Sequence, residues 1–373
     1  MKLCVTVVHA ALLSLTLTAG PIMATAQGQN PAPNPAQPKG QDIAVPAIKL
    51  FDRETIDRHA QTATSCVAFS PDGRVLAAAT SDGRLHLYQV ATAMLKASSE
   101  VVEDPLEAPY SIAYAPDGKT IAVGLGHGPI LLCDAANAKM TGVMRGHRKY
   151  VSALAYSPDG KTLASSCIEE GVRLWDTTTG RERAVLSADT GAPRQGLVRS
   201  LAFSPNGKIL ALASGPRAIL RWDAVTWKPL SRYQPVDAEG IGFGIVAFSP
   251  DGATLASSQG GGQRAIVLWD VATGRERAAL PNPTQDVKGL GFLSGGRTLV
   301  SLGNEMHGAL RTWDTMTSTS QEVINLGWSP SCLAVSPDGK TVAVGAFGGN
   351  GLMGVVELFD FDGQKLSRRQ GKN

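Results

Sequence analysis

The sequence predicts an all-β protein, a seven-bladed β-propeller made of four-stranded antiparallel blades. Three observations lead to this prediction: a four-residue turn phrase occurs seven times, a short apolar strand precedes each copy, and a large aromatic residue closes a later strand in most copies. The last glycines of successive phrases lie 42 to 47 residues apart. Seven units at such a period indicate a single repeat architecture rather than several domains, and four short strands per unit are typical of propeller blades.

The turn phrase reads Ser-Pro-Asp-Gly in its fullest form. Proline presets the backbone at the second position of a tight turn, Asp or Asn suits the third, and glycine adopts the left-handed backbone of the fourth. Each copy is therefore expected to close a hairpin with a bulge. The copies occupy residues 70–73, 115–118, 157–160, 204–207, 249–252, 293–296 and 336–339, and the sixth copy, Leu-Ser-Gly-Gly, lacks the proline.

The strand in front of each turn has large apolar residues in its outer two columns and only Ala or Gly in the column between them. Alternation places the two kinds of residue on opposite faces of the sheet. A face that holds nothing larger than Ala is expected to lie close to another sheet, as it does where wedge-shaped sheets converge on an axis. The seven strands are 67–69, 112–114, 154–156, 201–203, 246–248, 290–292 and 333–335.

Two further strands follow each turn, and a second turn, such as residues 179–181, then leads into a fourth strand. The third strand ends on Trp or Phe in five units, and we expect this column to have a structural role inside the blades. Its members are Trp175, Trp222, Trp269, Trp313 and Phe359, with Tyr88 and Cys133 at the same position of the first two units.

The turn phrase, the Leu-Ala-Ser of the second strand and the Leu-Trp-Asp of the third strand together resemble the WD-repeat (WD40-type) propeller family. The resemblance extends over roughly residues 48–366 and is strong because it recurs seven times. It implies a propeller that serves as a non-catalytic platform for another protein or a peptide.

The sequence departs from the family in a network of His, Asp, Ser or Thr, and Trp that the family often carries within a blade. Only Gly146-His147 matches the family's Gly-His pair, and the turn of that unit offers Glu169 in place of Asp. Asp82 matches the turn Asp in the first unit, which has Tyr88 in place of Trp. We therefore expect no unit to complete the network and the blades to be held mainly by apolar packing. His147 is expected to be a structural partner rather than a base.

Residues 1–26 have the organisation of a secretory signal peptide. Lys2 precedes an apolar run over residues 3–18, and the small residues at 24–26 suit signal peptidase, with cleavage before Gln27. A retained membrane anchor is the alternative, although the run is short for a span. We expect an exported protein, periplasmic or extracellular, whose mature chain has no transmembrane segment.

The rest of the chain divides into a Pro/Gln-rich linker, residues 27–46, and the propeller, residues 47–373. The chain of 373 residues is 43% hydrophobic and 18% charged, which is typical of a globular protein. Its formal net charge of +3, from 35 basic and 32 acidic residues, is too balanced to predict binding to nucleic acid. We expect a monomeric propeller whose partner is another protein or a peptide.

The cysteines of the propeller do not form the frequent paired motifs. No Cys-x-x-Cys occurs, so zinc-ribbon and thioredoxin chemistry have no support. We expect four buried thiols, and disulfides remain an alternative because an exported chain is exposed to oxidants. The four residues are Cys66, Cys133, Cys167 and Cys332.

No motif of a common catalytic or phosphate-binding site is present, so we expect no catalytic residue, no metal and no cofactor. Gly260-Gly261-Gly262 lacks a following Lys-Ser or Lys-Thr and is expected to be a hairpin tip. The histidines after the signal peptide show no spacing typical of metal ligands; they are His59, His86, His127, His147 and His307. One mouth of the channel is expected to contain no carboxylate and thus no calcium cage; its positions are Ser65, Tyr110, Ser152, Arg199, Gly244, Lys288 and Ser331.

The binding surface is expected at a rim, where loops connect the strands. The loops before the third strands of units five to seven are the longest, at residues 260–264, 304–308 and 347–354, and should crowd one side of one rim. Aromatic and arginine side chains gathered there suit a protein contact. For Tyr150 and Trp328 the alternative is a half-buried place within the blades. The candidate binding residues are Tyr150, Arg194, Arg199, Arg264, Lys288, His307, Trp328 and Phe347.

We expect an exported, non-catalytic scaffold that binds another protein or a peptide through its rim loops. Two alternatives remain open: a lactonase-like propeller hydrolase with a site at the channel mouth, and a sensor of a small ligand or glycan. A bound metal or converging carboxylates at a rim would favour the hydrolase, and an aromatic-lined pocket would favour the sensor.

The last blade needs an outer strand, which either end of the chain can supply. Residues 55–60 and residues 364–368 are the two candidates. We expect closure by the N-terminal segment, because joining the two ends of the chain removes a bare sheet edge. The basic tail with Arg368, Arg369 and Lys372 is then expected to be a solvated end.

Overall fold

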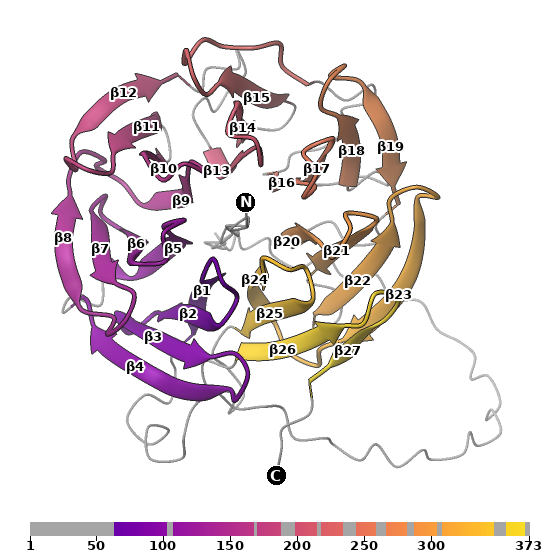
Figure 1. Ribbon diagram of the computed structural model, residues 1–373, viewed down its shortest axis with the longest axis horizontal. Coiled ribbons are helices and arrows are strands. Elements are labelled where there is room, and N and C mark those ends of the chain that lie inside the picture. The colour runs from indigo at the N-terminus through magenta and orange to yellow at the C-terminus, as the bar shows by residue number, and fades with distance from the viewer. Residues whose placement is uncertain are drawn as a thin grey trace, which may run out of the picture.

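The chain folds as a ring of β-sheets. A computed structural model describes residues 63–102, 107–167, 170–187, 198–214, 218–233, 244–258, 266–281, 287–303, 308–346 and 356–369. These residues form strands β1 to β27, which make seven antiparallel sheets arranged as blades around an axis (Figure 1). Within each blade the strands follow chain order from the axis outwards. The prediction of a seven-bladed, all-β propeller is confirmed. The described residues contain no helix long and apolar enough to cross a membrane.

The strand boundaries follow the predicted repeat. Blade one holds β1 (Thr64–Phe69), β2 (Val75–Thr80), β3 (Arg84–Gln89) and β4 (Met94–Glu100); blade two holds β5 (Pro109–Tyr114), β6 (Thr120–Leu125), β7 (Ile130–Asp134) and β8 (Met140–Met144); blade three holds β9 (Val151–Tyr156), β10 (Thr162–Cys167), β11 (Gly171–Asp176) and β12 (Glu182–Leu186); blade four holds β13 (Val198–Phe203), β14 (Ile209–Ser214) and β15 (Ala218–Asp223). Blade five holds β16 (Val246–Phe248), β17 (Thr254–Ser258), β18 (Ile266–Asp270) and β19 (Glu276–Leu280); blade six holds β20 (Val287–Phe292), β21 (Thr298–Gly303), β22 (Ala309–Asp314) and β23 (Thr319–Asn325); blade seven holds β24 (Pro330–Val335), β25 (Thr341–Ala346), β26 (Val356–Phe361) and β27 (Leu366–Arg368).

Blade four departs from the four-stranded pattern. Its outermost position is filled by two isolated bridges, from Ile219 to Tyr233 and from Trp222 to Pro229. Pro229 has no N–H to donate, so a continuous ladder cannot run through it. The Tyr233 ring compensates by stacking on Trp269 of blade five, with ring centroids 5.2 Å apart.

The turn phrase forms the hairpin between the first and second strands of each blade, as predicted. In blade one the hydroxyl of Ser70 donates to Asp72 Oδ1 at 2.6 Å and accepts the N–H of Val75 at 2.9 Å. Gly73 closes the turn with a φ of 73°, in the left-handed region that glycine adopts without steric cost. The phrase therefore brings its own hydrogen-bonding partners to the turn.

The seven turns form a ring in which each turn glycine lies against the preceding unit. A Cβ atom on Gly118 would lie 3.6 Å from Cδ of Pro71, and one on Gly73 would lie 3.6 Å from Cδ of Pro337 in blade seven. The sixth phrase has Ser294 where proline stands in the others. Its N–H, which proline lacks, donates to the carbonyl of Gly339 at 3.0 Å. The degenerate phrase thus replaces a proline contact with a hydrogen bond.

The small-residue column of the inner strands lies where neighbouring blades meet, as predicted. Ala68, Ala113 and Ala334 are buried. A Cβ atom on Gly291 would clash with a methyl group of Val335 in the next blade. The inner strands of adjacent blades therefore approach too closely for larger side chains in this column.

The aromatic residues that end the third strands fill the blade interiors. All five are buried, and they pack in apolar clusters with side chains of the same and adjacent blades. They are Trp175, Trp222, Trp269, Trp313 and Phe359.

The prediction that the N-terminal segment closes the ring was wrong. The fourth strand of blade seven is β27, which pairs antiparallel with β26 (Figure 1); residues 55–60 lie outside the described part of the chain. The physical reason is a local hairpin. The backbone N–H groups of Gln364 and Lys365 donate to Asp362 Oδ1 at 2.8 and 2.7 Å, and Gly363 has a φ of 105°. A short hairpin costs little entropy to close.

The two arginines of the basic tail are also not solvated ends of the chain, whereas Lys372 lies outside the described residues. Arg368 pairs with Glu357 at 3.2 Å, and Arg369 pairs with Asp360. The Arg369 guanidinium further donates to the carbonyl of Val90 in blade one at 2.8 Å. These two arginines therefore join the end of the chain to blade seven and blade one.

Candidate functional site

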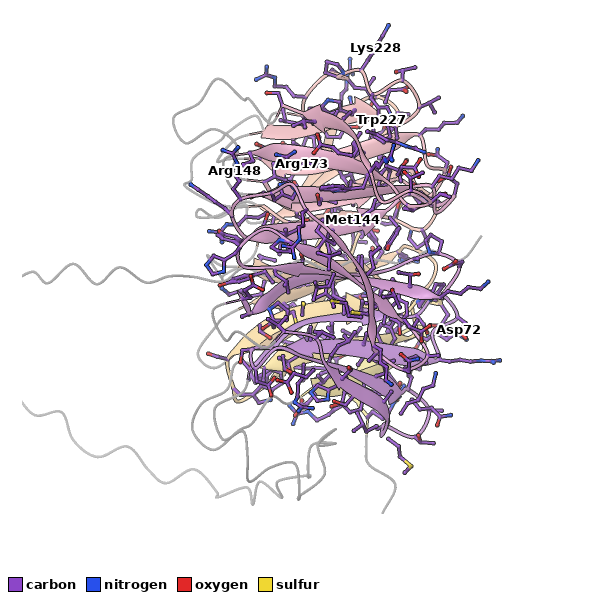
Figure 2. All side chains as sticks on the ribbon, turned by 90° about the vertical axis from the view of Figure 1, so that its left-hand side faces the viewer. Asp72, Met144, Arg148, Arg173, Trp227 and Lys228 are labelled. Carbon is purple, nitrogen blue, oxygen red and sulfur yellow. The ribbon has the colours of Figure 1, made fainter. Side chains whose placement is uncertain are left out.

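The two rims of the propeller carry different parts of each repeat. The Ser-Pro-Asp-Gly turns lie at one rim, where Figure 2 labels Asp72, and the segments that precede the first strands lie at the other, where it labels Arg148. Arg173 is labelled close to Arg148. The candidate residues Tyr150 and Trp328 come just before first strands, so they belong with the Arg148 rim.

Half of the candidate binding residues lie in the described part of the chain. Of these, Lys288 and Trp328 are only 2% and 8% exposed. Trp328 packs in the apolar cluster of the last blades and hydrogen bonds to Glu357. Neither side chain offers much surface to a partner, and Lys288 is not the exposed rim charge that the sequence suggested. The candidates outside the described residues are Arg194, Arg264, His307 and Phe347.

The remaining two candidates are partly exposed. Arg199 is the second residue of β13. The Tyr150 ring stacks on Tyr110 of β5, with centroids 5.1 Å apart and planes 27° from parallel. Arg148 and Lys149, immediately before Tyr150, are exposed. An aromatic pair flanked by cations therefore lies at this rim, between the inner strands of blades two and three.

Next to this pair, blade three contains a chain of hydrogen bonds. The Trp175 Nε1–H donates to Ser165 Oγ at 2.7 Å, and Ser165 Oγ lies 2.6 Å from Nε2 of His147. His147 Nδ1 lies 3.2 Å from Glu170 Oε2. With Nδ1–H donating to the carboxylate and the serine hydroxyl donating to Nε2, every member has a partner.

The expectation that no blade completes the network was therefore wrong. Glu170, and not Glu169, supplies the carboxylate in blade three, because the turn before β11 places Glu170 beside the imidazole. Among the described residues, blades five and six show the Trp–Ser bond, from Trp269 to Ser257 and from Trp313 to Ser301, both at 2.9 Å. Apolar packing is thus supplemented by a polar anchor in three blades.

Burial decides the charge of this network. It lowers the pKa of His147 to about 4, against the opposing effect of Glu170, so the imidazole is neutral near pH 7. Burial likewise raises the pKa of the Cys167 thiol to about 12, and Glu170 adds to this effect. A protonated thiol is a poor nucleophile, so the proximity of Cys167 to His147 does not amount to a catalytic pair.

Cys167, Glu170 and His147 form a cluster that the sequence did not reveal. A ring nitrogen of the histidine, the cysteine Sγ and a carboxylate oxygen all lie within 4.8 Å of one another. Their spacing along the chain matches no familiar metal motif. The Gly-His pair was the one signal in the sequence that pointed to this position.

The comparisons with known proteins identify the repeat. Residues 53–89 and 138–176 match the family of the WD domain, G-beta repeat (WD40). The second segment contains the complete His147, Ser165, Glu170 and Trp175 network. No curated protein matches the chain. The chain is thus a seven-bladed β-propeller in which two segments, in blades one and three, are similar to the WD40 repeat.

Proposed function

We propose that this propeller is an exported, non-catalytic scaffold that binds another protein or a peptide at the Arg148 rim. The observation that supports this most directly is the stacked pair of Tyr110 and Tyr150. Both rings are partly exposed, and Arg148 beside them is exposed. Tyrosine and arginine side chains are the residue types that contribute most to protein interfaces. Propellers of the WD40 type are commonly protein-interaction scaffolds, which favours the same role here.

The setting of the pair supports rigid recognition. Tyr110 belongs to β5, and Tyr150 directly precedes β9; both are innermost strands that are almost fully buried. Side chains held on such strands lose little conformational entropy when a partner binds. Export rests on residues 1–26, which read as a signal peptide and lie outside the described residues.

Affinity capture tests the proposed role. The full chain, as exported by its source cells, is immobilised and exposed to envelope and secreted proteins. A double variant, Tyr110→Ala with Tyr150→Ala, is compared with Val225→Ala, which changes a side chain that is 74% exposed in the turn after β15. We expect the wild type and the Val225 variant to retain a common protein that the tyrosine variant loses.

The other outcomes are equally informative. If all three forms retain the same protein, the scaffold role is supported, but the binding site lies away from the tyrosine pair. If a correctly folded wild type retains no protein, the scaffold is wrong, and the hydrolase and ligand-sensor alternatives take its place.

A further inference from the structure

The cluster of His147, Cys167 and Glu170 brings three different donor atoms to one point of the Arg148 rim. His147 precedes β9, Cys167 is the last residue of β10, and Glu170 lies in the turn before β11. Their donor atoms lie within 4.8 Å of one another, with Nδ1 and Oε2 at 3.2 Å. Tetrahedral ligands of a zinc ion are about 3.3–3.8 Å apart, so shifts of about an ångström would bring the three onto one ion.

We propose that His147, Cys167 and Glu170 bind one Zn²⁺ ion through Nδ1, Sγ and a carboxylate oxygen, with water as the fourth ligand. A set of one nitrogen, one sulfur and one oxygen suits zinc, whereas Ca²⁺ and Mg²⁺ prefer oxygen ligands alone. The Glu170 side chain is 19% exposed, so the ion has a path to solvent on that side.

Two of the three ligands are already oriented by neighbouring groups. His147 is held at Nε2 by Ser165, which in turn accepts the Trp175 N–H. The Glu170 carboxylate accepts the backbone N–H of Arg148 at 3.1 Å. Such outer hydrogen bonds fix the rotamers of metal ligands and are typical of built metal sites.

The charges around the cluster also suit a divalent cation. A thiolate at Cys167 and the carboxylate of Glu170 carry two negative charges, which balance Zn²⁺. Arg173 lies 3.8 Å from Glu170, but it also forms an ion pair with Glu182. The charge of Glu182 balances that of Arg173, so the two together add no net charge next to the ion. The site with its ion therefore has no net charge to bury, which removes the largest penalty of a half-buried ion.

Binding requires two proton movements. The thiol of Cys167, whose Sγ now lies 3.2 Å from the carbonyl of Lys149, loses its proton to solvent and gives the sulfur pair to the ion. The imidazole proton moves from Nδ1 to Nε2, so the ring stays neutral. The bond to Ser165 then reverses: the serine hydrogen turns away from the ring, and Oγ accepts the Nε2–H. One proton is therefore released for each ion bound.

Titration of the full chain with Co²⁺ and Zn²⁺ tests the site. Cobalt gives a thiolate-to-metal absorption in the near ultraviolet only if a cysteine binds it, and calorimetry with Zn²⁺ in two buffers counts the protons released. We expect one ion per chain and one proton per ion. Cys167→Ser should abolish the cobalt band and weaken Zn²⁺ binding by at least about 100-fold. Cys133→Ser removes an equally buried thiol in blade two and should change neither.

A second variant tests the site even if Cys167→Ser fails to fold. Glu170→Gln keeps a side chain of the same size and removes one ligand charge; its single amide oxygen, in the place of Oε2, can accept from both His147 and the Arg148 N–H. We expect weaker Zn²⁺ binding in this variant with unchanged unfolding in the absence of metal. The proposal is overturned if the wild type binds no ion stoichiometrically, or if the cobalt band persists in Cys167→Ser. It is also overturned if Glu170→Gln binds Zn²⁺ as the wild type does.

Discussion

Ser165 is the residue on which the polar interior of blade three depends. Its single hydroxyl accepts from Trp175 and reaches His147, and all three side chains are buried. In blade five the corresponding Ser257 accepts from Trp269, its one side-chain partner among the described residues. The two serines therefore occupy the same place in the repeat but satisfy different numbers of buried groups.

Replacing each serine by alanine should separate these roles. Ser257→Ala leaves the buried N–H of Trp269 without its partner, which should lower the free energy of unfolding by about 1–3 kcal/mol. Ser165→Ala leaves both the Trp175 N–H and the His147 ring nitrogen without a partner, so the loss should be about twice as large. The free energies of unfolding from urea titrations give the comparison. Equal losses in the two variants would show that His147 does not depend on Ser165.

His147 gives the protein a specific response to acid. Its pKa is 6.5 when unfolded and about 4 when folded, because burial disfavours the charged ring. Between these values the unfolded chain binds more protons, so the free energy of unfolding should fall as the pH drops from 6.5 to 4, by on the order of 3 kcal/mol. A turn carboxylate such as Asp251 contributes at lower pH. Hydrogen bonds from Ser249 and Ala253 lower its pKa below 3.8, so its protonation reduces the free energy of unfolding only below the pH range in which His147 titrates.

The acid response is measured by urea titrations between pH 7 and pH 4, with a chelator present. His147→Gln removes the titrating ring while keeping a side chain that forms hydrogen bonds. We expect its stability to change much less over this pH range than that of the wild type. Parallel curves for the two proteins would contradict the assignment to His147.

At the scale of the single element, the turn of blade seven is more constrained than the others. Gly339 has a φ of 69°, and a Cβ atom there would clash with the backbone nitrogen of Ser294. Gly180 has the same φ of 69°, but a Cβ atom there would meet nothing within 4 Å. The two glycines thus share backbone strain and differ only in the contact with the neighbouring blade.

Alanine substitution at these glycines separates the two effects. Gly180→Ala should cost about 1–2 kcal/mol, the penalty for a left-handed alanine. Gly339→Ala should cost at least about 1–2 kcal/mol more, because the methyl group pushes blades six and seven apart. Urea midpoints measure both variants. If the two variants lost similar amounts of unfolding free energy, blades six and seven would accommodate the added methyl group without strain.

The elements also show what the sequence could and could not predict. The turn phrase brings its own hydrogen-bonding partners, so its seven copies located the inner hairpins. Ring closure was not predictable, because residues 55–60 and 364–368 both fitted an outer strand and the turn at Asp362 decided between them. The partner of His147 was missed by one residue, since Glu169 and Glu170 are adjacent residues of one type and the sequence alone does not distinguish them. The burial of Lys288 depends on neighbouring blades, which the strand's own sequence does not describe.

At the scale of the whole molecule, blades seven and one are the last and the first of the described blades along the chain, so the joint between them lies outside the sequence of blade-to-blade connections. Side chains of both blades, among them Val67 and Leu333, share one apolar cluster, and two hydrogen-bonding contacts between described residues add to it at opposite ends of the blades. Near the axis the Ser331 hydroxyl donates to the carbonyl of Thr64 at 2.6 Å. At the outer side Arg369 pairs with Asp360 and donates to the carbonyl of Val90.

Arg369 should therefore stabilise the ring more than an ordinary surface arginine does. Arg369→Met removes the donor of two blade contacts and should lower the free energy of unfolding by about 1–3 kcal/mol. Lys365→Met, whose ammonium is 3.8 Å from Glu322 and whose side chain is 69% exposed, is the control and should change it by less than about 1 kcal/mol. Hydrogen exchange gives the location: the amides of β1 and β26 should exchange faster in Arg369→Met while those of blades three and four keep their rates. In a closed ring each blade packs against a neighbour on both sides. If the Arg369→Met substitution raised amide exchange rates equally in all blades, the ring would open as one unit, and Arg369 would not specifically stabilise the joint between blades seven and one.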